Sequence, residues 1–180
     1  MTFCLPNEIE IGGLAFPVRT DFRVILEIFV MLDDPDLTDA DKTEALFRMF
    51  YVERPLDAEK ALRAFTDFVD PRHGSQGKKS SGRLIDWQQD FDLMVAPINH
   101  ILGFECRAAD YLHWRTFLSA YLEIPPESVF ARVLRIREKL RTGKKLEKNE
   151  RSWYNKNRDL VHLKPKFSKA EEDILSDWIK

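Results

Sequence analysis

Two stripes of large apolar residues, one on each side of Gly103, constrain the fold more than any other feature of this sequence. The first stripe has the spacing of three and four residues of one helix face and consists of Trp87, Phe91, Met94, Val95, Ile98, Ile101 and Leu102. The second stripe repeats that spacing with Tyr111, Trp114, Phe117, Leu118, Tyr121 and Leu122. Two such stripes predict antiparallel helices that bury their rings against each other, and thus a helical packing unit.

The length and composition of the chain favour one helical domain. With 180 residues and 44% hydrophobic content, the chain can bury a sizeable core. We expect a mainly α fold, a compact multi-helix bundle of amphipathic helices with a short N-terminal β-hairpin. Within a single domain 1–180, an alternative is two lobes, 1–70 and 84–165, joined by a mobile loop 71–83, with a terminal helix at 166–180.

The expected loop follows from an abrupt change in composition. Residues 70–83 contain three glycines, three serines and one proline, and no large apolar residue. Such a segment cannot offset its ordering entropy by burial, which predicts mobility. The run Gly77–Ser80 has a faint likeness to a phosphate-binding loop, but Arg72 stands where the first glycine belongs, and we reject that interpretation.

The N-terminal part has the pattern of a hairpin followed by three amphipathic helices. Alternating residues flank Gly12-Gly13, and two glycines that can take positive φ are a hairpin signal. The helices are expected to begin after Asp21 or the threonine before it, after Thr38 with an imperfect capping box, and near Asp57. Their apolar stripes are most simply core.

Three further helical segments are expected after the aromatic stripes. Ser128 is predicted to cap a helix that carries both apolar residues and arginines. A looser helix is expected within 144–158, which is mostly polar and charged. Ser168 and Glu171 form a good capping box for the terminal helix.

Charge is strongly segregated along the chain. Residues 1–70 carry 7 Lys/Arg against 15 Asp/Glu, a net charge of −8, whereas residues 132–169 carry 14 against 4, a net charge of +10. Either the two segments neutralise each other inside the fold, or a basic surface is offered to an acidic partner, nucleic acid or protein. The candidate partner-binding residues are Arg132, Arg135, Arg137, Arg141, Lys144 and Lys145.

The chemically interesting side chains favour structural roles. His100, Cys106 and His113 lack recurrent metal-ligand spacing, and a core histidine is the simpler interpretation. Asp86 and Asp90 place two carboxylates four residues apart on one helix face, but Asp86 also suits an N-cap and Asp90 the first turn. We expect no catalytic residue, no cofactor and no metal, and thus no enzyme.

The sequence also bears on location. No apolar run reaches the roughly 20 residues of a membrane helix, and the first residues lack the pattern of a signal peptide. Two cysteines, Cys4 and Cys106, do not make a disulfide framework in a chain of this length and fit a reducing compartment. We expect a cytoplasmic protein without a membrane partner.

Five short motifs occur in a defined order between about Ile9 and Leu160. They are Thr20-Asp21-Phe22-Arg23, Asp33-Asp34, Asp86-Trp87-Gln88-Gln89-Asp90, Leu112-His113-Trp114 followed by Phe117, and Ile136-Arg137. In this order they resemble the bacteriophage and prophage protein family named "gene product fifteen". Arg115 stands where a second tryptophan would be expected. The motif residues that we interpret as structural are Asp21, Phe22, Trp87, Asp90, Leu112, His113, Trp114 and Phe117.

The resemblance implies a small helical protein encoded among the tail genes of a phage. It implies a non-enzymatic tail assembly chaperone that holds the tape-measure protein in the host cytoplasm before the tail tube polymerises. A helix-in-groove mode would suit such a partner, with other tail proteins and self-association as further expectations. Two alternatives stay open: nucleic-acid binding through 132–169, with Trp153 and Tyr154 stacking a base, and a structural component of the tail.

Overall fold

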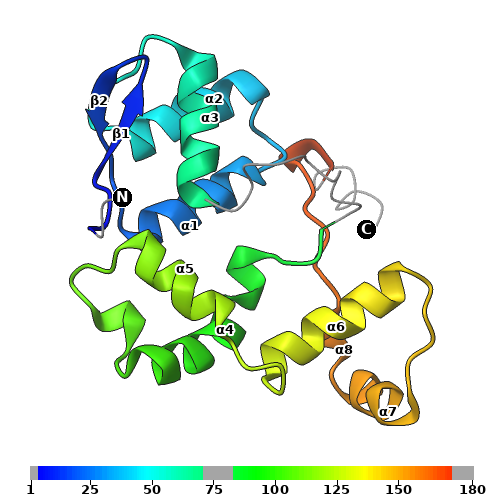
Figure 1. The fold of residues 1–180 in the computed structure, drawn as a ribbon. Coiled ribbons are helices and arrows are strands. Elements are labelled where there is room, and N and C mark those ends of the chain that lie inside the picture. Colours follow the sequence, from blue (N-terminus) through cyan, green and yellow to red (C-terminus); the bar gives the residue numbers. More distant parts are fainter. Residues whose placement is uncertain (1–3, 71–82, 172–180) are drawn as a thin grey trace. The chain divides into compact units, whose positions relative to one another are not determined.

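The computed structural model describes residues 4–70 and 83–171. These residues form eight α-helices, one short 3-10 helix and a two-stranded antiparallel hairpin near the N-terminus (Figure 1). The expected mainly α fold with an N-terminal hairpin is confirmed. Most of the expected mobile loop, residues 71–82, and the last part of the expected terminal helix, residues 172–180, lie outside the described residues.

The chain groups into two compact units. Unit 1 comprises residues 1–78, 111–116 and 166–180, and unit 2 comprises residues 79–110 and 117–165. The expected lobes 1–70 and 84–165 differ from these units because residues 111–116 group with the N-terminal part. The division into domains stays a prediction, and each unit is described by itself.

The hairpin in unit 1 forms as its glycines predict. Strands β1 (Glu8–Ile11) and β2 (Leu14–Pro17) pair in antiparallel register around Gly12 and Gly13. The two glycines have φ of 61° and 85°, the left-handed conformation that a tight two-residue hairpin turn requires. Val18 forms an isolated bridge with Tyr51, and β1 packs against α3. These contacts supply the support that a lone hairpin lacks in water.

Three helices complete most of unit 1: α1 (Phe22–Leu32), α2 (Asp39–Phe50) and α3 (Ala58–Val69). All three begin where the sequence predicts. Asp21 accepts from the Arg23 backbone N–H, Thr38 is the N-cap of a complete capping box, and Asp57 accepts from Lys60. The helices enclose a core of aromatic rings, in which Phe50 lies 4.9 Å from Phe65 between ring centroids. Burial of these rings is the main stabilising contribution to the unit.

Unit 2 is built on helix α4 (Trp87–Leu102). Asp86 caps its N-terminus through the backbone N–H groups of Gln88 and Gln89, and Gly103, with φ of 78°, ends it. The remaining elements are η1 (Cys106–Ala108), α5 (Trp114–Leu122), which begins in unit 1, α6 (Val129–Arg141), α7 (Lys148–Lys156) and α8 (Arg158–Val161). Helix α4 packs against α6, and the buried residues of these two helices include Met94, Ile98, Val133 and Ile136.

The predicted pairing of the two aromatic stripes is right for one contact and wrong for another. Trp87, which is half-buried, lies 5.5 Å from Tyr121 between ring centroids. Trp114, in contrast, belongs to unit 1, where its ring contacts Phe29 at 5.7 Å and its indole N–H donates to the Val69 carbonyl at 3.0 Å. The stripe therefore does not form one helix hairpin, because its first aromatic residues serve a different core.

Candidate partner-binding site

Four of the five motifs contact one another in two pairs, and the first pair lies in unit 1. Segment 20–23 forms an isolated antiparallel bridge with segment 112–114, between Asp21 and His113. The Phe22 backbone N–H donates to the Leu112 carbonyl at 2.9 Å, and the Asp21 carboxylate accepts from the Leu112 N–H at 3.2 Å. Hydrogen bonds to Arg23 and Leu112 hold the Asp21 pKa below its ordinary value, against the opposing effect of burial. This pair closes the start of α1 onto the start of α5.

His113 is a core histidine with both ring nitrogens occupied. Its Nδ1 accepts from the Arg115 backbone N–H at 2.9 Å, so the ring proton resides on Nε2, which donates to the Pro6 carbonyl at 2.9 Å. The neighbouring Arg115, at the position of the expected tryptophan, places its guanidinium 5.4 Å from the centre of the Phe68 ring. A cation over an aromatic face thus lies where the resemblance implies a second ring.

The second motif pair lies in unit 2 and includes Arg137, one of the predicted partner-binding residues. Arg137 is buried and binds Asp90 through two parallel hydrogen bonds of 2.6 and 2.8 Å, with side-chain exposures of 5% and 0%. Its other donors reach the carbonyls of Leu84, Leu160 and Val161 at 2.7 to 2.9 Å. All five guanidinium N–H groups are therefore engaged. Arg137, one of the residues predicted to bind a partner, thus lies in the core and exposes only 5% of its side chain.

The same ion pair fixes the chain after α7. Arg137 holds the carbonyls of Leu160 and Val161, and the Gln89 amide donates to His162 and accepts from Lys164 at 2.9 and 3.0 Å. Residues 160–164 are thereby tied to α4 and α6. The motif at the start of α4 and the motif near the end of α6 therefore hold residues 160–164 in place together.

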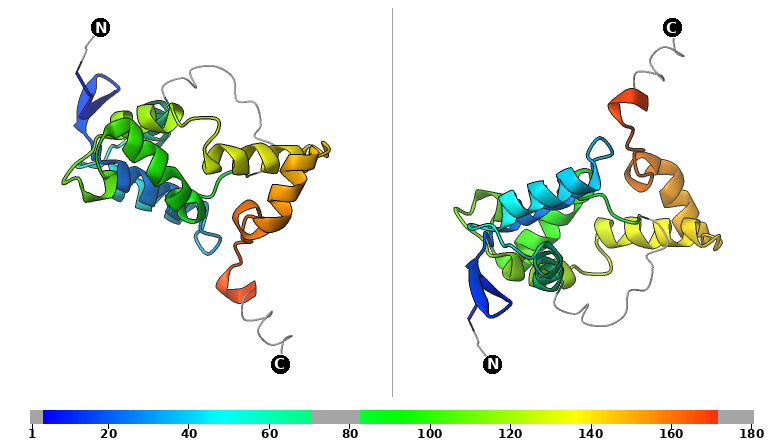
Figure 2. Two further views of the ribbon diagram at one scale, coloured as in Figure 1. Left: turned by 90° about the horizontal axis from the view of Figure 1, so that it is seen from below. Right: turned by 90° about the horizontal axis from the view of Figure 1, so that it is seen from above.

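Helices α6 and α7 and the loop between them, residues 128–158, form a segment that we call the basic helix pair, and Figure 2 shows the course of its backbone. It carries 11 Lys/Arg, one of them the buried Arg137, against 3 Asp/Glu, a net charge of +8. Ser128 caps α6, Gly143 turns the chain with φ of 67°, and Glu147 opens α7 in a capping box with Glu150. The predicted cap and the looser helix within 144–158 are both present.

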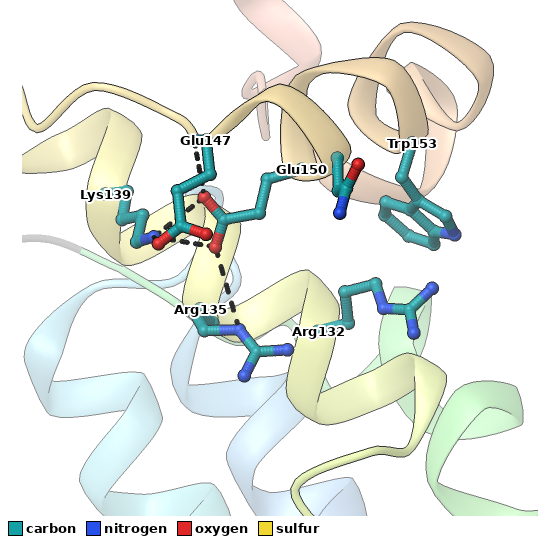
Figure 3. A pocket seen from close by; sticks show the side chains of 7 residues that line it. Arg132, Arg135, Lys139, Glu147, Glu150 and Trp153 are labelled. Atoms are coloured by element: carbon teal, nitrogen blue, oxygen red, sulfur yellow. Dashed lines mark hydrogen bonds and ion pairs between the residues drawn. The ribbon is translucent and has the colours of Figure 1, made fainter.

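A groove of about 470 Å³ lies between the two helices. It is lined by Arg132, Arg135, Lys139, Glu147, Asn149, Glu150 and Trp153 (Figure 3). The Arg132 guanidinium lies over the Trp153 ring, 5.4 Å from its centroid. The Arg135 side chain is 49% exposed. Two of the predicted partner-binding residues, Arg132 and Arg135, are therefore brought together on one wall of a groove.

Glu150 is the acidic centre of this groove. Lys139 Nζ donates to both of its carboxylate oxygens at 2.7 Å, and the Glu147 backbone N–H donates to one of them at 2.9 Å. Arg135 Nε is 4.0 Å away, beyond hydrogen-bond distance. The hydrogen bonds from Lys139 and Glu147 lower the Glu150 pKa, so the side chain is a carboxylate at neutral pH.

The other predicted basic residues lie outside this groove. Lys144 and Lys145 are exposed and line a separate cleft of about 410 Å³ with Arg151 and Tyr154 among its other residues. Arg141 binds Glu138 one turn away at 2.5 Å. The sequence analysis missed Lys139, Glu147 and Glu150 as groove residues. The Glu147–Glu150 pair forms a capping box at the start of α7, but a local cap does not determine which side chains of α6 the helix faces.

Within 4–70 and 83–171, no group of three or more His, Cys, Asp or Glu side chains is arranged to hold a metal ion. No helix in these ranges combines the length and the apolar character needed to cross a bilayer. The candidate site is the groove of the basic helix pair.

The fold and the groove define a mainly α protein that is closed by two buried motif pairs and presents a basic helical surface. The family model of the bacteriophage Gp15 protein matches residues 1–163, and the chain belongs to this family. It is accordingly a phage protein of the structural or morphogenesis kind. Comparison with curated proteins finds no match, and comparison with solved structures finds none.

Proposed function

We propose that this protein is a tail assembly chaperone that holds the tape-measure protein in the host cytoplasm before the tail tube polymerises. Family membership supports a morphogenesis role. The observation that carries the finer proposal is the basic helix pair, with its charge of +8 and its open groove. A tape measure is a long, largely helical chain, and holding such a chain requires a groove rather than a reaction. We therefore propose a non-enzymatic role.

The groove supports a helix-in-groove mode of binding. Arg132 and Arg135 supply positive charge on one wall, and Trp153 supplies an aromatic surface beside them. Charge of one sign on a binding surface speeds encounter with an oppositely charged partner and selects among partners. Such a surface suits transient capture of a client that must later be released.

Nucleic-acid binding is the competing function, and the net charge of residues 128–158 favours it. The rings expected to stack bases have other contacts, since Arg132 lies over Trp153, and Tyr154 contacts His162 with ring centroids 5.7 Å apart. The two proposals differ in one observable. Retention on DNA that falls steeply as salt is added supports the competitor, whereas no retention at low salt removes it.

Co-expression with the tape-measure protein of the same phage tests the proposed function. We expect the chain to raise the soluble yield of the tape measure and to purify with it. The double variant Arg132→Glu/Arg135→Glu should lose both effects. The matched control is Arg48→Glu/Arg63→Glu, which reverses two arginines of unit 1 with side-chain exposures of 79% and 76% and should retain both.

If the unchanged chain neither raises tape-measure solubility nor purifies with it, the chaperone function is wrong. Mass spectrometry of purified particles then decides whether the protein is instead a structural component of the tail, because a component remains in the particle and a chaperone leaves it.

A further inference from the structure

We propose that the groove between α6 and α7 binds side-chain carboxylates displayed along one face of a partner helix, and that Glu150 is a built-in competitor for them. In this proposal Arg132 and Arg135 receive the carboxylates, and Trp153 contacts the apolar stems beside them. The inference rests on the proposed function and adds the chemistry of the partner segment.

The placement of the two arginines argues for a helical ligand. Arg132 and Arg135 are three residues apart on α6, so their side chains leave the same face of the helix, one turn apart. Carboxylates three or four residues apart on a partner helix have the same spacing. A guanidinium can also bind a carboxylate through two parallel hydrogen bonds, which gives geometric selectivity.

The cations of the groove differ in how fully they are engaged. Lys139 is held by Glu150 through two hydrogen bonds of 2.7 Å. Arg135 lies 4.0 Å from the same carboxylate and stays 49% exposed, and Arg132 faces the groove over the Trp153 ring. The two arginines therefore have donors for a ligand, whereas Lys139 already has its anion.

Glu150 makes the groove partly self-neutralised. As Figure 3 shows, its carboxylate lies beside Lys139 and Arg135. A ligand carboxylate would be attracted to the same place. A bound anion must tolerate this nearby like charge. Removal of the charge with little change of shape, as in Glu150→Gln, keeps the capping geometry of α7, since glutamine also serves at that position of a capping box. The variant should bind an anionic ligand more tightly.

The test uses the full chain and two synthetic helical peptides of identical composition. In one peptide the glutamates recur three and four residues apart on a single face, and in the other they are spread around the helix. Calorimetry gives the affinities, and tryptophan fluorescence compared with that of Trp153→Phe locates the binding. We expect the single-face peptide to bind about tenfold more tightly, because only its glutamates can meet both arginines of the groove at once. We also expect its fluorescence signal to disappear in Trp153→Phe.

Three variants sharpen the result. Arg132→Glu/Arg135→Glu should weaken the single-face peptide about tenfold or more, and a peptide with lysines in place of the glutamates should then bind that variant. The matched control, Lys144→Glu/Lys145→Glu, makes the same charge change in the separate cleft and should leave most of the affinity. Glu150→Gln should tighten binding of the single-face peptide severalfold.

Failure of this inference can be told from failure of the proposed function. Equal affinities for the two peptides, or equal losses of affinity in the two double variants, would indicate binding to a diffuse electrostatic surface. Either result would contradict specific binding in the groove. Weaker binding by Glu150→Gln would overturn the competitor role. The chaperone function is decided separately, by whether the tape measure purifies with the unchanged chain.

Discussion

Arg137 and Asp90 form a buried ion pair in the core of unit 2. Both side chains are buried, and the guanidinium also satisfies three backbone carbonyls. Truncation of one partner leaves a buried charge without its counterpart. We therefore expect Arg137→Met to lower the free energy of unfolding by about 3–5 kcal/mol, measured by urea denaturation.

Two comparisons make this prediction specific. Arg151→Met, at an exposed position of the same unit, should change stability by only about 0.5 kcal/mol or less. The double variant Asp90→Leu/Arg137→Met should be less destabilised than Arg137→Met alone, because no charge is then left buried. A loss below about 1 kcal/mol in Arg137→Met would mean that the ion pair does not hold the unit together.

Tyr51 offers a prediction at high pH. Its ring is buried, its hydroxyl donates to the Ala61 carbonyl at 2.8 Å, and burial raises the pKa of Tyr51 to about 12. The neutral form is thus favoured in the folded chain. Its contribution to stability is complete below the ordinary value of 10.0 and is lost as pH rises through about 12.

Absorbance titration near the tyrosinate band checks this prediction. Tyr51→Phe should remove one late-titrating tyrosine, and its stability should approach that of the unchanged chain as pH rises from 10 to 12. The control Tyr111→Phe alters an exposed ring and should keep the late step. A Tyr51 that titrates near pH 10 would contradict the buried position described for it.

The hairpin depends on the backbone conformation of its glycines. Gly13 has φ of 85°, and a Cβ there would meet nothing within 4 Å. The cost of a side chain is therefore purely conformational. We expect Gly13→Ala to lower stability by about 1–2 kcal/mol, and Gly13→Asn, which tolerates the left-handed region, to lower it less. Equal losses in thermal unfolding would point to a cause other than φ.

The basic helix pair should respond to acid through Glu150. Hydrogen bonds from Lys139 and Glu147 hold the pKa of this carboxyl below its ordinary value of 4.5. Its contribution to stability is accordingly complete above that value and is lost as pH falls below it. The stability of Glu150→Gln should therefore fall less than that of the unchanged chain as the solution is acidified below pH 4.5, measured by chemical denaturation at each pH. An identical acid dependence would show that Glu150 is not held as described.

The elements differ in how well the sequence predicts them. Helix starts at Asp21, Thr38, Asp57, Asp86 and Ser128 are predicted correctly, because a cap involves residues within one turn. The pairing of Asp90 with Arg137 spans 47 residues and has no local signal. Sequence patterns therefore predict Arg137 to be a surface cation, and only the fold shows that its side chain is buried.

The same distinction holds for the candidate site. The net positive charge after residue 128 is evident in the sequence. The groove depends on which α6 side chains face α7, and this follows from the turn at Gly143 and from the contact between Lys139 and Glu150. Arg132, Arg135, Lys144 and Lys145 are all predicted as partner-binding residues, but the sequence does not predict that the two arginines and the two lysines line different clefts.

For the molecule as a whole, we assign structural roles to the motif residues and partner binding to the groove residues. The motifs at 20–23, 86–90, 112–114 and 136–137 close the two units from within. The basic helix pair remains as the surface for a partner. Substitutions in the motifs should therefore reduce folding, whereas substitutions in the groove should reduce partner binding and leave folding intact.

Hydrogen–deuterium exchange of the complex purified with the tape-measure protein tests this division most directly. The account predicts slower exchange on complex formation within residues 128–158, and unchanged exchange in the hairpin at residues 8–17. Protection of the hairpin with no change across α6 and α7 would contradict it.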